Sequence, residues 1–388
     1  MAIALDSLDK ADRIEAADSS DTAGRRLSGL PFSFSGKAGE YFGIWIVNLL
    51  LSVVTLGIYS AWAKVRNKRY FYGNTSLDGS SFAYLASPMQ ILKGRIIAFA
   101  FFAAYAICTT IWPVTLGAFL LLMFAVAPWV IVRARAFNAF QSTYRNVRFG
   151  FTGRIGEAFK LYVLWPAASL ATLGLALPYV AYLTDRFLVE NSRYGRTEMS
   201  FAGESSAYFR IYGVAFLVGL PAIMLIGYVL VFIALAVTRT IGLDAAEAES
   251  AMARLILDYT LPLFRYKAWL PFVIPAAVIL GIVASSYLTT RRQNYLFNST
   301  KVGPHQLTLN LSFARILWIR FSNLVVIALS VGLMIPWARI RMARYQIEQM
   351  SLIPAGSLNT LVGDEKSRTA AYGDEFGEGM DLDVGLGV

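Results

Sequence analysis

The residue types that most often carry chemistry are scarce in this chain. It has one histidine, His305, and one cysteine, Cys108. A single histidine excludes a multi-histidine metal site, and a single cysteine excludes an intrachain disulfide. The sequence contains no G-x-S-x-G, Walker A, G-x-G-x-x-G or H-E-x-x-H motif. We therefore expect a protein without enzymatic activity, cofactor or metal.

Two acidic residues occur in matching contexts at the edge of apolar segments. Glu40 lies in GKAGEYF and Glu157 lies in GRIGEAF, each at the start of a segment that we expect to be helical. A carboxylate in the first turn interacts favourably with the positive end of the helix dipole. Starting a helix is one interpretation of these residues. The other is that both are functional carboxylates.

These residues belong to a chain that is too apolar for an ordinary soluble protein. Its 388 residues are 56% hydrophobic and 15% charged, with a formal charge of +10 and a mean hydropathy of +0.53. Soluble domains average about 25% charged residues, so this chain has too few charges to cover a soluble surface. The composition indicates a membrane protein and disfavours a disordered protein, a secreted disulfide scaffold or a nucleic-acid binder.

The charge is distributed unevenly along the chain. Residues 1–30 and 355–388 are polar and acidic, and we expect both to be disordered tails. The intervening membrane domain, 31–354, carries 29 Lys and Arg against 12 Asp and Glu, a net charge of +17. Because cytoplasmic loops of membrane proteins are rich in bases, clusters of bases guide the expected topology.

The membrane domain contains two kinds of apolar segment. Four approach the ~20 apolar residues that span a bilayer, and we expect transmembrane helices at 95–112, 114–132, 211–237 and 269–289. Three are interrupted by Thr-Leu-Gly, Thr-Leu-Gly and Ser-Val-Gly, at 42–62, 161–183 and 321–338. The three interrupted segments either cross the bilayer or re-enter without crossing. Their length favours crossing, whereas the charge of their flanks favours re-entry.

A recurring pattern follows five of the apolar segments. An aromatic residue comes first, bases follow one helical turn later, and a second aromatic residue comes eight positions after the first. Positions i, i+4 and i+7 share one face of a helix. One interpretation is an aromatic belt with a positive-inside signal. The other is a set of sites for anionic lipid headgroups, with these candidate residues: Trp62, Arg66, Arg69, Trp129, Arg133, Arg186, Trp337, Arg341 and Arg344.

Short alternating segments precede the apolar segments. Examples are Phe32-Ser-Phe-Ser-Gly36 and Leu307-Thr-Leu-Asn-Leu311. Period-two alternation predicts strands, which we expect to pair in a small sheet on the cytoplasmic side. Extended linkers are the alternative. Together the patterns predict an all-α multi-pass membrane protein with short strands and five internal repeats, at about 32–75, 82–143, 149–192, 201–300 and 307–348.

The stretch LGIYSAWAKVRNKRYFYGNT, at 56–75, is the most specific motif of the chain. It resembles the YjgN-like family of bacterial inner-membrane proteins, a family of unknown function, and the weaker repeats extend this resemblance over about 31–350. The resemblance implies a multi-pass protein of the inner membrane. It implies no substrate, cofactor or catalytic residue.

Two functions remain open for a non-catalytic membrane protein of this kind. Internal repeats and interrupted helices are typical of transport proteins, so a transport or permeation function is the first expectation. The aromatic and basic helices favour the alternative, an inner-leaflet protein that binds anionic lipids or acts as a scaffold. The partners expected in either case are membrane lipids.

Overall fold

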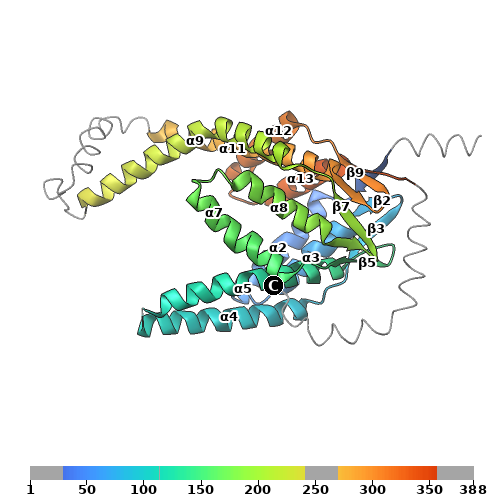
Figure 1. Ribbon diagram of the computed structural model, residues 1–388, viewed down its shortest axis with the longest axis horizontal. Coiled ribbons are helices and arrows are strands. Elements are labelled where there is room, and N and C mark those ends of the chain that lie inside the picture. The colour runs from blue at the N-terminus through green and yellow to red at the C-terminus, as the bar shows by residue number, and fades with distance from the viewer. Residues whose placement is uncertain (1–28, 113, 241–269, 356–388) are drawn as a thin grey trace, which may run out of the picture. The chain divides into compact units, whose positions relative to one another are not determined.

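The computed structural model describes residues 29–112, 114–240 and 270–355 (Figure 1). The expected disordered tails, 1–30 and 355–388, lie outside the described residues except at their inner margins. The described residues form two compact units. The second consists of the described residues within Phe209–Arg292 and Ser312–Val326, and the first contains the rest.

Helices make up most of the described chain. Four are long and apolar enough to cross a membrane, as expected: Pro88–Ile111, Thr115–Phe140, Ser205–Val231 and Phe272–Asn298. The helical elements are α2 (Ala38–Val54), α3 (Ser60–Gly73), α4 (Pro88–Ile111), α5 (Thr115–Phe140), α6 (Ile155–Phe159), the π-helix η1 (Lys160–Leu164), α7 (Trp165–Ala171), α8 (Leu177–Glu190), α9 (Ser205–Thr240), α11 (Leu270–Asn298), α12 (Phe313–Leu329) and α13 (Ile335–Glu348).

Ten short strands close into an antiparallel barrel in the order β1-β10-β9-β8-β7-β6-β5-β4-β3-β2. The prediction of an all-α protein is therefore wrong, although the five alternating segments do form strands. Each of them pairs with a shorter strand that the sequence analysis did not identify. The strands are β1 (Leu30–Phe34), β2 (Thr75–Leu77), β3 (Ser80–Tyr84), β4 (Ser142–Tyr144), β5 (Val147–Phe151), β6 (Ser192–Tyr194), β7 (Thr197–Phe201), β8 (Thr300–Val302), β9 (His305–Leu309) and β10 (Met350–Ile353).

Side chains from both kinds of strand fill the interior of the barrel. Leu77, Tyr144, Val147, Tyr194 and Leu352 are buried together there, with further aromatic rings packed against them. The rings of Phe82 and Tyr144, which face each other across paired strands, lie 4.8 Å apart. The Tyr144 hydroxyl donates to the Leu77 carbonyl at 2.8 Å. The barrel interior is thus a packed core, as in other small barrels.

The antiparallel pairing places the start and the end of every helical hairpin at one end of the barrel. Each longer strand leads into an outgoing helix (α2, α4, α6, α9 or α12), and each returning helix (α3, α5, α8, α11 or α13) leads into a shorter strand. Because such strands are antiparallel neighbours, one ends where the other begins. We call this end the helical rim.

The opposite end, the turn rim, carries the tight turns between strands. Asp78 and Gly79 have φ angles of +47° and +70°, as a two-residue hairpin turn requires. Strands β1 and β10 also pair, with Leu30 opposite Leu352. The chain therefore enters and leaves the barrel at the turn rim.

The interrupted segment between α2 and α3 turns back on itself. Asn48 Nδ2 of α2 donates to Asn67 Oδ1 of α3 at 3.2 Å, and the rings of Tyr41 and Tyr70 lie 5.4 Å apart, so the two helices run antiparallel. The strands that flank 161–183 and 321–338 are also antiparallel neighbours, so the chain enters and leaves each of these segments at the same end of the barrel. Re-entry of the three interrupted segments fits this topology and stays a prediction.

A hydroxyl side chain satisfies the backbone at the tip of each interrupted hairpin. Thr55 Oγ1 donates to the Leu51 carbonyl at 2.7 Å and accepts the Tyr59 N–H at 2.9 Å. The next two residues, Leu56 and Gly57, have φ angles of +49° and +90°. The same pair of bonds involves Thr172 and Ser330 in the other two hairpins. Such internal pairing is what a chain reversal surrounded by hydrocarbon requires.

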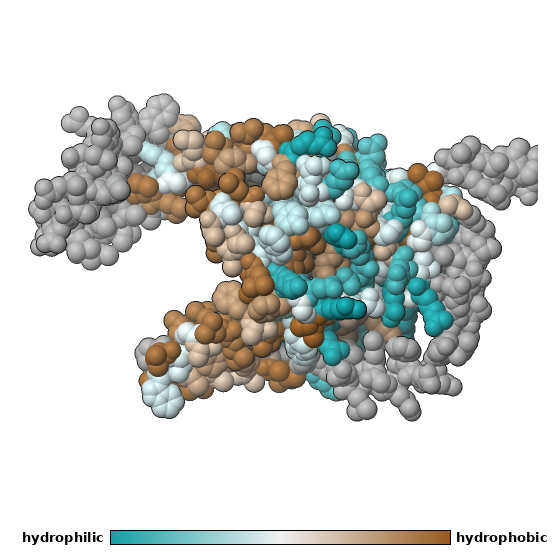
Figure 2. All heavy atoms as spheres, viewed as in Figure 1, coloured by the Kyte–Doolittle hydropathy of each residue, from teal (hydrophilic) through white to brown (hydrophobic). Residues whose placement is uncertain are grey.

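The hydropathy of the surface differs between the helical hairpins and the strands. In Figure 2, hydrophobic residues cover the hairpin of α4 and α5, whereas hydrophilic residues gather nearer the strands. Exposed side chains on this hairpin include Phe99 and Leu121, which are 75% and 73% exposed. A surface of this kind is stable against lipid and not against water.

Reporters fused before Met1 and after Val388 should report the same compartment. Four crossing helices and three re-entrant hairpins return the chain to its starting side, and both ends leave from the turn rim. Paired alkaline phosphatase and green fluorescent protein fusions measure the side of each end. Opposite readings at the two ends would contradict this topology.

Replacing Thr55 with valine should destabilise the protein by about 1–3 kcal/mol, because the Tyr59 N–H loses its acceptor in an apolar setting. Thermal unfolding of the detergent-solubilised protein measures the effect. The matched control is Thr55→Ser, which retains the hydroxyl. Equal unfolding temperatures for Thr55→Val and the unmodified protein would show that the tip does not depend on this bond.

Candidate functional site

In three returning helices, the aromatic and basic pattern lies at the same distance from the residue that caps the helix. Helices α3, α5 and α13 end at the capping residues Asn74, Gln141 and Gln349. Eight residues before each cap, or about 12 Å along the helix, lies an arginine: Arg66, Arg133 or Arg341. We call these three residues the arginine belt. Twelve residues before each cap, about 18 Å along the helix, lies a tryptophan: Trp62, Trp129 or Trp337.

Arg341 and Trp62, two residues of this pattern, each contact an aromatic ring. The Arg341 guanidinium lies 5.1 Å from the centre of the Trp337 ring, and the Trp62 ring stacks on Tyr59 at 6.0 Å. The side chain of Arg66 is exposed. These placements agree with the expected order of an aromatic level followed by a basic level. Headgroup binding by these residues stays a prediction.

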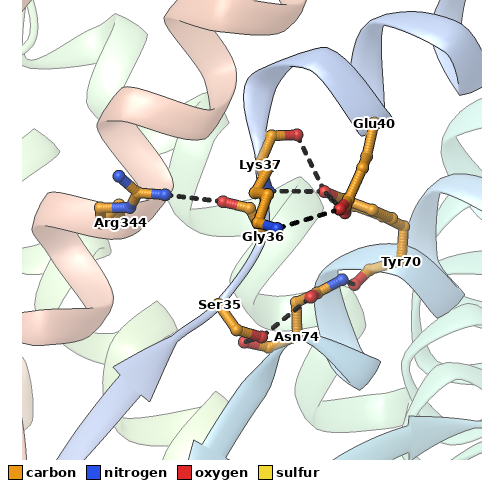
Figure 3. Close-up of polar contacts among 7 residues, drawn as sticks. All are labelled: Ser35, Gly36, Lys37, Glu40, Tyr70, Asn74 and Arg344. Carbon is orange, nitrogen blue, oxygen red and sulfur yellow. Dashed lines mark hydrogen bonds and ion pairs between the residues drawn. The ribbon is translucent and has the colours of Figure 1, made fainter.

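Two of the candidate arginines contact the backbone of the barrel. Arg344 Nη2 donates to the Gly36 carbonyl at 2.8 Å (Figure 3), and Arg69 Nη2 donates to the Ala86 carbonyl at 2.9 Å. Gly36 and Ala86 lie in equivalent turns between a longer strand and its outgoing helix. In a third turn, Asn294 takes the same place and bonds Leu311. Arg69 and Arg344 therefore join their own returning helices, α3 and α13, to the next turn around the barrel.

Glycine at position 36 permits the close packing of this turn. A Cβ atom there would lie 2.5 Å from the Phe34 ring, which folds over the turn. Gly153 and Gly203 meet the rings of Phe151 and Phe201 in the same way. The recurring aromatic-x-Gly pattern thus has a steric cause.

Arg186 has a local partner on its own helix. Its Nε lies 3.0 Å from both carboxylate oxygens of Glu190, one turn further along α8. Hydrogen bonding to Glu190 raises the pKa of Arg186 above its usual range. Both side chains are exposed, so this pair contributes little to stability.

The two candidate carboxylates lie in the first turns of their helices. Glu40 Oε2 is 3.2 Å from the Tyr70 hydroxyl, and its Oε1 is 3.7 Å from Lys37 Nζ (Figure 3). Burial raises the pKa of Tyr70, and the negative charge of Glu40 raises it further. Glu157 is exposed in the first turn of α6. These positions agree with a role at helix starts, and the functional role stays a prediction.

Four bases that sequence analysis missed form a cluster above the helical rim. Lys64 and Lys68 lie one turn apart on α3, Arg95 lies on α4 and Arg135 on α5. We call these four residues the cationic cluster. In the described part of the chain, no acidic side chain forms an ion pair with any of them.

Burial and mutual repulsion act on the lysines of the cationic cluster. Burial and the positive charges of Lys64 and Arg135 lower the pKa of Lys68 to about 8. Burial and the charge of Arg95 lower the pKa of Lys64. Lys68 Nζ also contacts Asn138 Oδ1 and lies 4.6 Å from the centre of the Tyr84 ring. Two contacts join the three helices here: Arg95 of α4 contacts Ser60, one turn before Lys64, and Lys68 contacts Asn138, three residues after Arg135.

A buried acid lies on the neighbouring helix α8. Asp185 is 3% exposed, and its Oδ2 accepts the Tyr208 hydroxyl at 2.7 Å. Burial raises the pKa of Tyr162, on which the charges of Arg135 and Asp185 act in opposite directions. Tyr162 belongs to the π-helix η1, a rare local structure that often occurs at functional sites.

Little in the sequence points to these residues. The i, i+4 spacing of Lys64 and Lys68 was a usable signal. The proximity of α3, α4 and α5 comes from the barrel, which brings the first two returning helices next to each other. Sequence spacing within one helix does not contain that information.

Replacing Arg344 with glutamine should destabilise the protein by about 1–3 kcal/mol, because the Gly36 carbonyl loses a charged donor. Replacing Arg66 with glutamine is the matched control, since its side chain is exposed on an equivalent helix. Thermal unfolding in detergent compares the two variants. An equal loss in both would show that Arg344 has no special role in joining the barrel.

The chain matches a family described as bacterial proteins of unknown function (DUF898), over residues 29–379. It is 25% identical over 372 residues to Inner membrane protein YjgN of Salmonella typhimurium, covering 86% of this chain and 91% of that protein. It is 32% identical over 126 residues to Inner membrane protein YjgN of Escherichia coli O157:H7, covering 31% of this chain and 30% of that protein. No solved structure matches the chain.

These relatives and the four membrane-crossing helices confirm the expected location. The protein is a multi-pass protein of the inner membrane. Since the family match extends from the first strand of the barrel to beyond the last, the chain belongs to the DUF898 family of bacterial proteins, whose YjgN-like members its sequence resembles.

Proposed function

We propose that this membrane protein binds anionic phospholipid headgroups through the arginine belt and acts without catalysis. The observation that carries the proposal is the common level of Arg66, Arg133 and Arg341, each eight residues before the cap of its helix. Three guanidinium groups at one level, one turn from a tryptophan, match the order of apolar boundary and phosphate in a leaflet.

The lengths of the helices support this placement of the membrane. Helix α4 ends 25 residues after the rim residue Ala86, or about 38 Å along the helix, which leaves about 26 Å beyond the arginine level. A hydrocarbon core is about 30 Å thick. Helix α2 ends 18 residues after Gly36, about 15 Å beyond that level. The tip of the re-entrant hairpin then lies near the middle of the bilayer.

The excess of bases supports a cytoplasmic barrel. The membrane domain 31–354 carries a net charge of +17, and bases favour the cytoplasmic side. We further propose that the membrane domain consists of five structural repeats. Each repeat is a longer strand, a helical hairpin and a shorter strand. Each repeat then contributes one returning helix to the surface that faces the inner leaflet.

Transport is a second candidate function, and one observation favours it. Asn48 lies within the re-entrant hairpin, is 4% exposed, and no hydrogen-bond donor in the described part of the chain reaches its Oδ1. Interrupted helices with polar groups line substrate paths in transporters. A path beside the hairpins suits this candidate better than one through the barrel, whose interior is packed. Absence of flux in proteoliposomes over a broad solute panel would count against it.

Replacing Arg66, Arg133 and Arg341 together with glutamine should reduce retained anionic lipid at least about fivefold, since each base near an anionic surface contributes about 1 kcal/mol. Mass spectrometry of lipids that co-purify with the full chain measures the retention.

The matched control replaces Arg145, Arg193 and Arg196 with glutamine, since these bases lie on the strands and turns next to the turn rim. Their loss removes the same charge away from the proposed membrane surface. Unchanged lipid retention in the belt variant, or an equal loss in the control variant, would refute the proposal.

A further inference from the structure

We propose that the cationic cluster of Lys64, Lys68, Arg95 and Arg135 is a binding site for a phosphomonoester headgroup, which carries up to two negative charges. The inference rests on the proposed function and deepens it by assigning one headgroup class to one site. The arginine belt meets the general surface of the leaflet, whereas this cluster lies between three helices and is suited to a single ligand.

Position along the helices places the cluster at headgroup level. Arg95 lies nine residues after the rim residue Ala86, about 13 Å along α4. Lys68 and Arg135 lie six residues before their caps, about 9 Å from the same rim. The proposed belt lies about 12 Å from that rim. A headgroup phosphate in the leaflet therefore lies within reach of all three residues.

The charges in the cluster call for an anionic ligand. Lys64, Lys68 and Arg95 are half-buried, and Arg135 is exposed. Half-buried bases that repel one another are costly unless a negative charge compensates them. The described part of the chain supplies no such charge to any of the four residues. Burial, and after it the positive charges of Lys64 and Arg135, lower the pKa of Lys68.

The polar groups around the cluster suit phosphate oxygens. Arg95 donates to Ser60 Oγ through one nitrogen of its guanidinium, which leaves further N–H groups for a ligand. The Tyr84 hydroxyl lies 3.5 Å from Lys68 Nζ and 3.2 Å from Asn138 Oδ1. Two lysine ammonium groups and two guanidinium groups supply more charge than a phosphodiester, with one negative charge, would neutralise.

The apolar surface above the cluster suits acyl chains. Ile96, Ile97 and Phe99 follow Arg95 on α4 and are 57%, 52% and 75% exposed. A lipid whose phosphate contacts Arg95 has its chains alongside these residues. This surface favours a lipid over a free phosphate compound as the source of the phosphomonoester.

The experiment compares two lipids of different headgroup charge. The full chain in detergent is titrated with phosphatidate, a monoester, and with phosphatidylglycerol, a diester, and native mass spectrometry counts the bound lipid. Phosphatidate should bind at least about fivefold more tightly, because one further charge interaction contributes about that factor. The double variant Lys68→Gln/Arg135→Gln should lose this preference and retain phosphatidylglycerol binding.

A matched control and a competitor complete the test. The variant Arg66→Gln/Arg133→Gln removes two belt charges and should keep the preference for phosphatidate. If glycerol phosphate competes as well as phosphatidate does, the ligand is a soluble phosphomonoester and not a lipid. The assignment of a phosphomonoester to the cluster would then still hold.

The two proposals fail in different ways. Equal binding of phosphatidate and phosphatidylglycerol, both above neutral phosphatidylcholine, would overturn the assignment of the headgroup class and leave the proposed function standing. Binding of neither lipid above phosphatidylcholine would overturn both. A preference that survives in Lys68→Gln/Arg135→Gln, with an unfolding temperature equal to that of the unmodified protein, would show that the site lies elsewhere.

Discussion

Backbone hydrogen bonding around a closed ring of strands is the interaction on which the rest of the structure depends. Strands of three to five residues are too short to be stable in isolated pairs, and closing the ring leaves none of them with an open edge. The ring then fixes where every helical hairpin starts and ends. The levels of the tryptophans and arginines follow from that, because each returning helix is tied to the ring at its cap.

The parts of the fold that sequence predicts are those with a strong local period. The four long apolar helices and the five alternating strands are of this kind. The shorter strands are not, because they are only three or four residues long, and Thr75–Leu77 begins directly after Asn74 in a polar stretch that resembles a turn. Without them the longer strands lack partners, so the barrel was missed and an all-α class predicted.

The same distinction applies to the candidate site. The spacing of Trp62 and Arg66 on one helical face is visible in the sequence, and the structure places them as expected along α3. What Arg69 and Arg344 contact is not visible, because their acceptors lie on a different strand–helix turn. The cationic cluster was missed for the same reason: its bases belong to three helices, and sequence spacing within one helix does not show which helices pack together.

The pairing of β1 with β10 has a consequence for biosynthesis. The first strand of the barrel, Leu30–Phe34, leaves the ribosome more than 300 residues before the last, Met350–Ile353, completes the ring. Throughout that interval β1 has an open edge, on a chain whose apolar helices are already entering the membrane. The pairing of β1 with β10, which closes the ring, therefore has to wait until the last strand has been synthesised.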